Sequence, residues 1–143
     1  MRIDIRIIKS AREDELTRLY KDAGWWKKEY DENTDFLKAL VPNSACFVGA
    51  FHENSMIGMG RALSDLASDA YIQDVTVLKP FRGKGIGSKI IKKLVAFLQQ
   101  HHVDWIGLIA KPNTSMFYVK LGFETLKDHV PLRFKGGVNH GCS

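Results

Sequence analysis

The sequence predicts an α/β fold of the α+β kind, in which a central mixed sheet carries helices on both of its faces. Two observations support this prediction. Short apolar stretches with strand-like alternation fill the first half of the chain, and turn residues join them into hairpins. The later strands are reached through amphipathic helices, and a helical crossover returns the chain parallel to the strand before it. One sheet must therefore contain both antiparallel and parallel pairs.

Length and composition predict one soluble domain. With 143 residues, of which 45% are hydrophobic and 26% charged, the chain can build a single core. We expect this domain to span residues 1–135, and the glycine-rich residues 136–143 to form a flexible tail. No apolar run is long enough to cross a membrane, and the N-terminus is unlike a signal peptide. Cys46 and Cys142 make neither a disulfide framework nor a metal spacing, which favours the reducing cytoplasm.

The N-terminal elements follow from alternation and capping patterns. Residues 3–9 alternate between apolar and polar side chains, as a half-buried strand does. Ser10 to Glu13 form a capping-box pattern, which predicts a helix from there to about Ala23. Residues 31–40 predict a second, short helix with its apolar residues on one side.

The middle of the chain predicts three strands. Residues 44–51 and 56–63 are small and apolar, and the polar turn between them predicts a β-hairpin. Gly58 and Gly60 lie inside the second of these strands, which indicates close approach of another backbone or of a ligand. Residues 70–78 form the third strand.

The last third of the chain predicts a helix over residues 85–101 and a strand over residues 103–109 that runs parallel to the third strand. A short helix follows from Pro112 to about Leu121, and residues 123–134 predict a final strand pair. The apolar stripe of the long helix consists of Ile86, Ile90, Ile91, Leu94, Val95 and Leu98.

The stretch from Tyr71 to Ser88 predicts an anion site. It passes from an apolar strand through a loop with Gly83, Gly85 and Gly87 into the long helix. Such a loop lets backbone N–H groups converge on a phosphate, and the helix adds the positive end of its dipole. The spacing fits neither a P-loop nor a dinucleotide fingerprint. A phosphorylated ligand of another kind is therefore expected.

Two blocks resemble one known family. Arg82-x-x-Gly85-x-Gly87, preceded by Val75 and Val77 in the strand, resembles the acetyl-CoA signature of the GNAT superfamily of N-acetyltransferases. The block Phe117-Tyr118-x-x-Leu121-Gly122-Phe123 resembles a second block of that family, in the same order along the chain. The resemblance implies the GNAT-like acyl-CoA N-acyltransferase fold and the use of acetyl-CoA, with CoA as the product.

The resemblance also implies roles for individual residues. Backbone groups at Val75 and Val77 would bind the pantetheine arm, and an N–H near Val75 would polarise the thioester carbonyl. Tyr118 would protonate the leaving sulfur; the alternative is a core aromatic residue. Asn113 stands five residues before Tyr118, closer than the family's commoner spacing. The implied cofactor-binding residues are Val75, Thr76, Val77, Arg82, Gly83, Lys84, Gly85, Ile86, Gly87, Ser88, Asn113 and Tyr118.

The acceptor side is predicted from acids and aromatic residues. Asp74 is the acid within the strand that leads to the reaction centre, so it is the candidate base, or a group that attracts a cationic amine. Alternation places it on the face opposite Val75. Asp65 is a second substrate candidate. Trp25 and Trp26 are substrate-pocket candidates as well, although one could pack into the core while the other covers the surface.

The sequence thus predicts a transferase that moves an acetyl group from acetyl-CoA to a primary amine, a small molecule such as an arylalkylamine or a polyamine. Alternatives are a protein or peptide N-acetyltransferase and a non-catalytic acyl-CoA-binding module. A homodimer is possible, whereas no membrane, metal or nucleic-acid partner is expected. The net charge of +5 suits either a solvated surface or an anionic cofactor. Cys46 as an acetylated nucleophile is a minor alternative.

Overall fold

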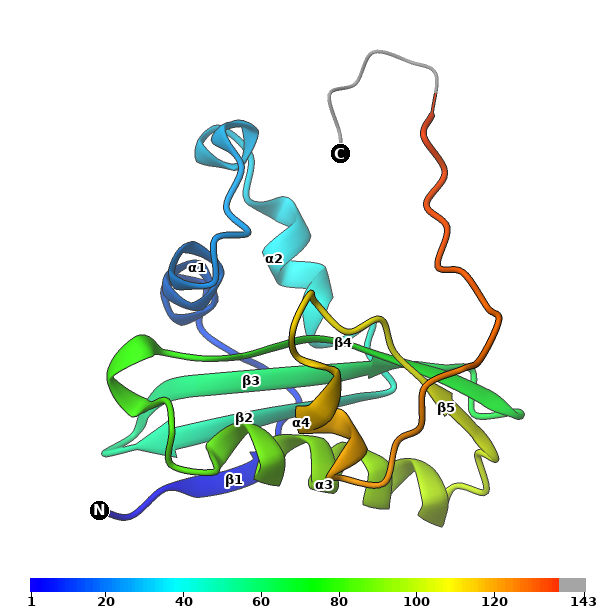
Figure 1. Cartoon of the computed structure of the whole chain (residues 1–143). Coiled ribbons are helices and arrows are strands. Elements are labelled where there is room, and N and C mark those ends of the chain that lie inside the picture. The colour runs from blue at the N-terminus through cyan, green and yellow to red at the C-terminus, as the bar shows by residue number, and fades with distance from the viewer. Residues whose placement is uncertain (137–143) are drawn as a thin grey trace. The chain divides into compact units, whose positions relative to one another are not determined.

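The computed structural model describes residues 1–136 (Figure 1). The chain divides into two compact units, residues 1–108 and residues 109–143. The first unit contains the sheet and the three longer helices, and the second contains one short helix. The prediction of one domain over residues 1–135 stays a prediction.

A five-stranded sheet forms the centre of the first unit. Its strands follow one another in chain order across the sheet, and the first four pair antiparallel with their neighbours. The fifth strand pairs parallel with the fourth, as the helical crossover between them predicts. The bounds of the strands are β1 Asp4–Ile7, β2 Cys46–His52, β3 Ser55–Leu63, β4 Asp69–Val77 and β5 Trp105–Gly107.

Helices cover both faces of this sheet, which confirms the predicted fold class. Figure 1 shows α1 (Glu13–Asp22) and α2 (Asp35–Leu40) on one face, and α3 (Ile86–Gln100) on the other. The predicted apolar stripe of α3 points into the core, except that Val95 is only half-buried. Burial of these aliphatic side chains against the sheet is the main source of stability of the first unit.

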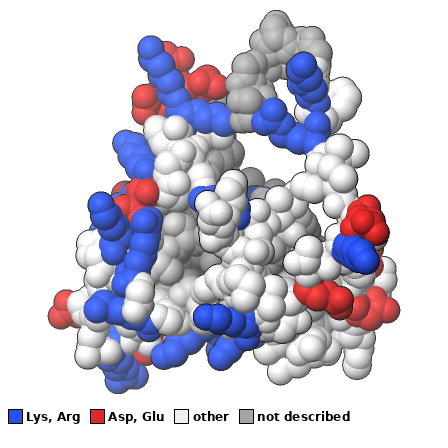
Figure 2. All heavy atoms as spheres, viewed as in Figure 1, with Lys and Arg blue, Asp and Glu red and all other residues white. Residues whose placement is uncertain are grey.

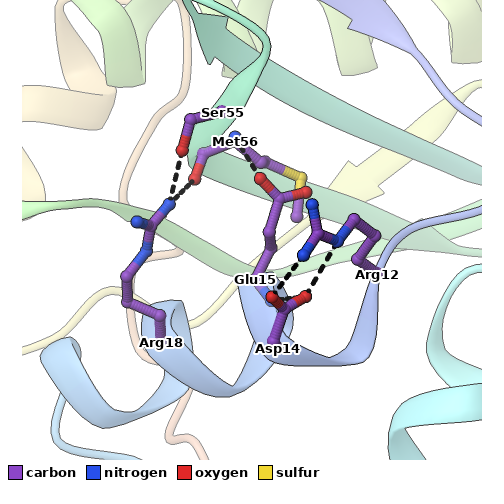
Figure 3. Close-up of polar contacts among 6 residues, drawn as sticks. All are labelled: Arg12, Asp14, Glu15, Arg18, Ser55 and Met56. Atoms are coloured by element: carbon purple, nitrogen blue, oxygen red, sulfur yellow. Dashed lines mark hydrogen bonds and ion pairs between the residues drawn. The ribbon is translucent and has the colours of Figure 1, made fainter.

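Two charged side chains of α1 fasten this helix to the β2–β3 hairpin (Figure 3). Glu15 Oε2 accepts a hydrogen bond of 2.8 Å from the N–H of Met56. Arg18 donates to Ser55 Oγ at 2.8 Å and to the Met56 carbonyl at 2.9 Å. Since Met56 is fully buried, its backbone groups need such partners. The contacts hold the N-terminal half of α1 at one end of the sheet.

The fourth strand departs from regular pairing on both of its sides. On the β3 side, the register shifts between Met59 and Arg61, so that two residues of β4 stand opposite Gly60 alone. This is a β-bulge, which bends a strand and increases its twist. On the β5 side, pairing covers only Asp69 to Tyr71. The part of β4 that leads into the glycine loop is therefore bulged and extends beyond its pairing with β5.

The glycines inside β3 lie where other groups come close; at Gly58 one of these is backbone, as predicted, whereas at Gly60 they are side chains. A Cβ at Gly60 would stand 2.7 Å from Ile90 Cγ2 and 3.2 Å from Leu94 Cδ1, both on α3. A Cβ at Gly58 would stand 3.3 Å from the Thr76 carbonyl. Gly60 thus lets α3 lie directly against the sheet beside the bulge.

The predicted start of the first helix was wrong. α1 begins at Glu13, its N-cap is Arg12, and no side chain caps it, so the capping box at Ser10 does not form. The three acids in its first turn stabilise the positive end of the helix instead. The second helix is also shorter than predicted. A 3₁₀ turn occupies Lys28–Asp31, and α2 begins only at Asp35.

The second unit contains α4 (Ser115–Val119), which lies inside the predicted range 112–121. The strand pair expected over residues 123–134 is wrong, because the structure has no strand there. The alternating apolar residues of this segment stay exposed, and Pro131 offers no N–H to a ladder. The predicted tail at 136–143 lies outside the described residues except for Gly136. Among residues 1–136, no helix is long and apolar enough to cross a membrane.

Candidate functional site

The junction between the glycine loop and α3 has the geometry of an anion site. Gly83 and Gly85 both adopt left-handed backbone conformations with φ of +78°, which favour glycine. A Cβ at either position would have no neighbour within 4 Å, so the space before them is open. No side chain caps α3, and its first internal bond joins the Lys89 N–H to the Gly85 carbonyl. The N–H groups of residues 86–88 therefore lie at the open end of the helix.

Arg82 organises the start of this loop. Its Nε donates to the Val77 carbonyl at 2.8 Å, and its Nη2 forms an ion pair of 2.8 Å with Asp22 Oδ2. The same carboxylate oxygen accepts a hydrogen bond of 3.2 Å from the Lys79 N–H. Asp22, the last residue of α1, thus ties the loop to a helix on the other face of the sheet. Arg82 remains half-exposed.

Further positive charge surrounds the loop. Lys84 in the loop and Lys89, Lys92 and Lys93 on α3 are all exposed. Figure 2 shows basic side chains gathered on the side of the first unit that carries the loop and along α3. Such a field attracts polyanions and favours binding of phosphates.

The strand before the loop can bind an extended ligand through its backbone. From Ile72 to Val77, the β5-facing edge of β4 lies beyond the three-residue parallel pairing. Val75, Thr76 and Val77 are half-buried there, and a 3₁₀ turn over Lys79–Phe81 joins this strand to the glycine loop. An unpaired strand edge presents N–H and C=O groups at regular spacing. These residues and the loop residues 82–88 lie in one segment of the chain, and their role as a cofactor site stays a prediction.

Asp74 lies at the bulge and is surrounded by donors. Its Oδ2 accepts a hydrogen bond of 2.8 Å from Arg61 Nε and one of 2.9 Å from the Tyr20 hydroxyl. Its side chain is on the α1 face, whereas Val75 comes within contact range of Gly60 beside Ile90, so the two lie on opposite faces, as alternation predicts. Burial, together with the negative charge of Asp74, raises the pKa of Tyr20. Tyr20 therefore holds its proton across the physiological range.

The tryptophans belong to a ring cluster on the α1–α2 side. Trp25 meets Tyr20 edge-on at 5.3 Å, and Trp26 meets Tyr30 at 5.2 Å. Phe36 of α2 joins both parts, with its ring 5.6 Å from Tyr20 and 4.2 Å from Tyr30. Both tryptophans are half-buried, so neither is a plain core residue. The cluster reaches the Asp74 carboxylate through the Tyr20 hydroxyl.

Two other sequence candidates lie elsewhere. Asp65 is exposed, and its Oδ1 accepts a hydrogen bond from the Ala67 N–H, so it stabilises the turn between β3 and β4. This turn lies at the end of β4 opposite the glycine loop. Cys46 is buried at the start of β2, and burial raises the pKa of its thiol to about 11. A thiol that stays protonated is a poor nucleophile.

Tyr118 and Asn113 belong to the second unit. Tyr118 is half-buried on α4, where its ring meets Phe117 at 5.0 Å and Phe123 at 5.9 Å. Burial raises its pKa above the ordinary value, so the phenol is protonated at neutral pH. Asn113 has φ of +66° in the turn before α4. Asparagine tolerates this conformation better than most residues.

Sequence reasoning missed three partners of the predicted residues: Arg61 and Tyr20, which bind Asp74, and Asp22, which binds Arg82. Tyr20 carried the stronger signal. It follows Leu16 and Leu19 on the apolar side of α1, and a buried tyrosine hydroxyl usually finds a partner. Arg61 stands in an otherwise apolar strand, which also indicates that an acid lies near it. The sequence did not show which acid each one meets.

Residues 8–123 match the Acetyltransferase (GNAT) family. The chain is 32% identical over 113 residues to the uncharacterized N-acetyltransferase ycf52 of Pyropia yezoensis. The aligned stretch covers 76% of this chain and 63% of that protein. The chain thus spans less than two thirds of the length of this relative.

Two plant proteins match a shorter stretch. Over 72 residues, which is half of its length, this chain is 43% identical to GCN5-related N-acetyltransferase 2, chloroplastic, of Arabidopsis thaliana. Over a stretch of the same length it is 42% identical to Histone acetyltransferase TAP1 of Glycine max. The match covers 28% and 31% of these proteins, respectively.

The fold is shared with solved structures. A Staphylococcus aureus protein of unknown function, described as a probable acetyltransferase, superposes with a TM-score of 0.80 at 23% identity, covering 94% of this chain and all of the other. At this identity the likeness concerns the fold alone. The match over residues 8–123, by contrast, shows the family. The chain belongs to the GNAT family of acetyltransferases.

Proposed function

We propose that this chain transfers an acetyl group from acetyl-CoA to the primary amine of a small molecule, by direct attack in a ternary complex. The observation that supports it most is the junction of β4 with α3. There, Gly83 and Gly85 hold left-handed conformations before an uncapped helix, at the end of a bulged strand. Family membership supports the same activity.

The residues present fit acetyl-CoA, which would supply an activated acetyl thioester. The open space before Gly83 and Gly85 admits a pyrophosphate, and the N–H groups of Ile86, Gly87 and Ser88 can donate to it. Hydrogen bonds to charged groups contribute about 1.5–3 kcal/mol each. Lys84 and Arg82 add positive charge. Val75, Thr76 and Val77 would bind the extended arm through the backbone of β4.

The chemistry needs a polarised carbonyl and a proton donor. A backbone N–H at Val75 would donate to the thioester oxygen; removing one such donor costs about 100- to 1,000-fold in rate. As the nitrogen–carbon bond forms and the carbon–sulfur bond breaks, Tyr118 would give its proton to the leaving sulfur. The proton that the amine loses passes to water and restores the phenol. Asn113 would assist cofactor binding from the turn before α4.

The acceptor in this proposal is an arylalkylamine or a polyamine. Trp25 and Trp26 supply apolar ring faces, which suit an aromatic substrate and also attract cations. Lys21 already lies over the Trp26 ring at 5.2 Å, so this surface accommodates a cation. Asp31 and its acidic neighbours Glu29 and Glu32 favour a substrate with several amines. Asp65 would bind substrate from its turn.

A protein or peptide acceptor is the second candidate. The observation that favours it is the match to a plant relative named as a histone acetyltransferase. A non-catalytic acyl-CoA-binding module is the third candidate. It would use the glycine loop without Tyr118 or any acceptor.

The proposal also includes a cellular compartment and binding partners. We expect the cytoplasm, although the name of the Arabidopsis relative places that protein in the chloroplast. The small amine is the expected partner, with a second copy of the chain as a further one. Fractionation of the native host tests the compartment, and sedimentation tests the dimer.

Calorimetric titration with acetyl-CoA tests the proposal first, with free CoA and ATP as comparisons. We expect micromolar binding of acetyl-CoA that Gly85→Glu abolishes, while circular dichroism shows an unchanged fold. A folded protein that does not bind acetyl-CoA would rule out both the transferase and the acyl-CoA module.

Thiol release with a panel of acceptors then separates the three candidates. Turnover with arylalkylamines or polyamines supports the proposal, and turnover with peptides alone supports the second candidate. Binding without turnover of any acceptor supports the third.

A further inference from the structure

Asp74 has a backbone conformation that few residues adopt. Its φ is +58°, in the left-handed region, inside a strand. It is the first of the two β4 residues that stand opposite Gly60. Aspartate adopts this region more readily than most residues, but inside a strand the conformation still costs free energy, which surrounding contacts must offset. The bulge therefore needs something that fixes it.

The side chain of Asp74 provides that restraint. Arg61 comes from β3 and Tyr20 from α1, so one carboxylate oxygen joins two elements to the bulge. The Arg61 and Asp74 side chains are only 13% and 20% exposed, so water competes little for these bonds. Two hydrogen bonds at 2.8 and 2.9 Å hold the Oδ2 oxygen of this carboxylate in place.

The Asp74 carboxylate is engaged by its partners, which favours a structural role for it. The Arg61 guanidinium is shielded from water and has this carboxylate as its counter-charge. Removal of the carboxylate at position 74 would leave this largely shielded guanidinium without its counter-charge. The Tyr20 hydroxyl also donates to the same oxygen, so that oxygen is already occupied twice.

We infer that Asp74 is a positioning residue: through Arg61 and Tyr20 it holds the β4 bulge, and the bulge directs the Val75 N–H at the thioester carbonyl. Asp74 does not take the proton of the amine, which goes to water. The inference rests on the proposed function, because the carbonyl is that of acetyl-CoA. It differs from the role of base that the position of Asp74 in the strand first indicated.

A pair of variants separates the two roles. Asp74→Asn leaves Arg61 without its counter-charge, and we expect kcat to fall about tenfold or more. The double variant Arg61→Gln, Asp74→Asn replaces the ion pair by two amides that can bond to each other. It contains no carboxylate at position 74, yet we expect kcat to recover to within about threefold of the wild type. Loss of a base could not be repaired in this way.

The carbonyl itself gives a second readout without any amine present. Infrared spectroscopy of bound, isotope-labelled acetyl-CoA measures the carbonyl stretch, which a hydrogen bond lowers. We expect a lowered frequency in the wild type, a smaller shift in Asp74→Asn and a restored shift in the double variant. Asp69→Asn, the same change at the exposed start of β4, is the matched control and should leave both kcat and the stretch unchanged.

The results distinguish a positioning role of Asp74 from a role as base. Should Asp74→Asn keep the wild-type stretch and the double variant stay inactive, Asp74 is the base and the inference is overturned. Where the variants at 74 do not fold, Tyr20→Phe removes a single oxygen and should raise the carbonyl frequency; an unchanged frequency overturns the inference. If the wild type itself does not bind acetyl-CoA, the proposed function fails first and the inference with it.

Discussion

Two single residues matter most for the proposed activity: Tyr118 through its phenolic proton, and Gly85 through its backbone conformation. Tyr118 holds a phenolic proton that burial makes harder to remove. Gly85 holds a left-handed conformation at the start of α3, where a side chain would stand in open space before the helix. Each can be tested by a change of a single atom.

Replacing Tyr118 by Phe should lower turnover at least about tenfold, because general acids contribute about 100- to 10,000-fold and the variant keeps the ring. The affinity for acetyl-CoA should change little, since only the hydroxyl is lost. Steady-state kinetics and calorimetry measure the two quantities. Unchanged turnover would remove Tyr118 from the mechanism.

Replacing Gly85 by Ala should lower acetyl-CoA affinity about tenfold or more, because the Cβ enters the space for the pyrophosphate. Gly24→Ala is the matched control. Gly24 has φ of +82° and equally open surroundings but lies outside the loop. Both variants should lose about 1 kcal/mol of unfolding free energy from backbone strain. Equal loss of affinity in the two would refute a specific role for Gly85.

At the level of elements, the packing of α3 against the sheet positions the candidate anion site. The helix lies close to β3 only because Gly60 has no side chain. The bulge of β4 stands opposite this glycine, so the helix and the bulge share one contact. A change at Gly60 should therefore disturb both.

Gly60→Ala should lower the free energy of unfolding by about 1–3 kcal/mol, as overpacking does. The new Cβ would lie 2.7 Å from Cγ2 of Ile90, a β-branched side chain with little freedom. Gly58→Ala should cost less, since its nearest contacts are all 3.3 Å. Urea unfolding of both variants gives the comparison. The packing argument fails if Gly58→Ala is the more damaging change.

On the scale of the whole molecule, pH should affect stability through buried acids that stay protonated. Burial raises the pKa of Cys46 to about 11 and also raises that of Tyr20. The unfolded thiol ionises near pH 8.5. The folded state thus binds more protons above that pH, and its stability falls as pH rises from there towards 11.

Comparison with Cys46→Ala isolates the thiol. Between pH 8 and pH 10, the wild type should lose about 1–2 kcal/mol more unfolding free energy than Cys46→Ala, because only the wild type has this thiol. Urea unfolding at the two values measures the difference, and the titration of lysines and tyrosines cancels between the variants. Equal losses would show that Cys46 does not hold its proton in the fold.

The sequence by itself determined the elements whose cause is local. Glycines in the loop predicted the left-handed turns, since φ depends on the residue itself, and apolar periodicity predicted α3 and most of the sheet. The motif around Arg82, Gly85 and Gly87 indicated the family, because a phosphate loop is one short continuous stretch. Helix ends were less certain, as the unformed capping box at Ser10 shows.

Only the tertiary structure decided which distant residues meet. Tyr20 and Asp74 are 54 positions apart, and Arg82 and Asp22 are 60 apart. Several acids could have accepted a hydrogen bond from Tyr20 or from Arg82, and the choice depends on the packing of α1 against the sheet. The exposed segment after residue 123 has strand-like alternation but no partner strand. Strand pairing requires two segments to meet in space, and the sequence of one segment does not show whether a partner is present.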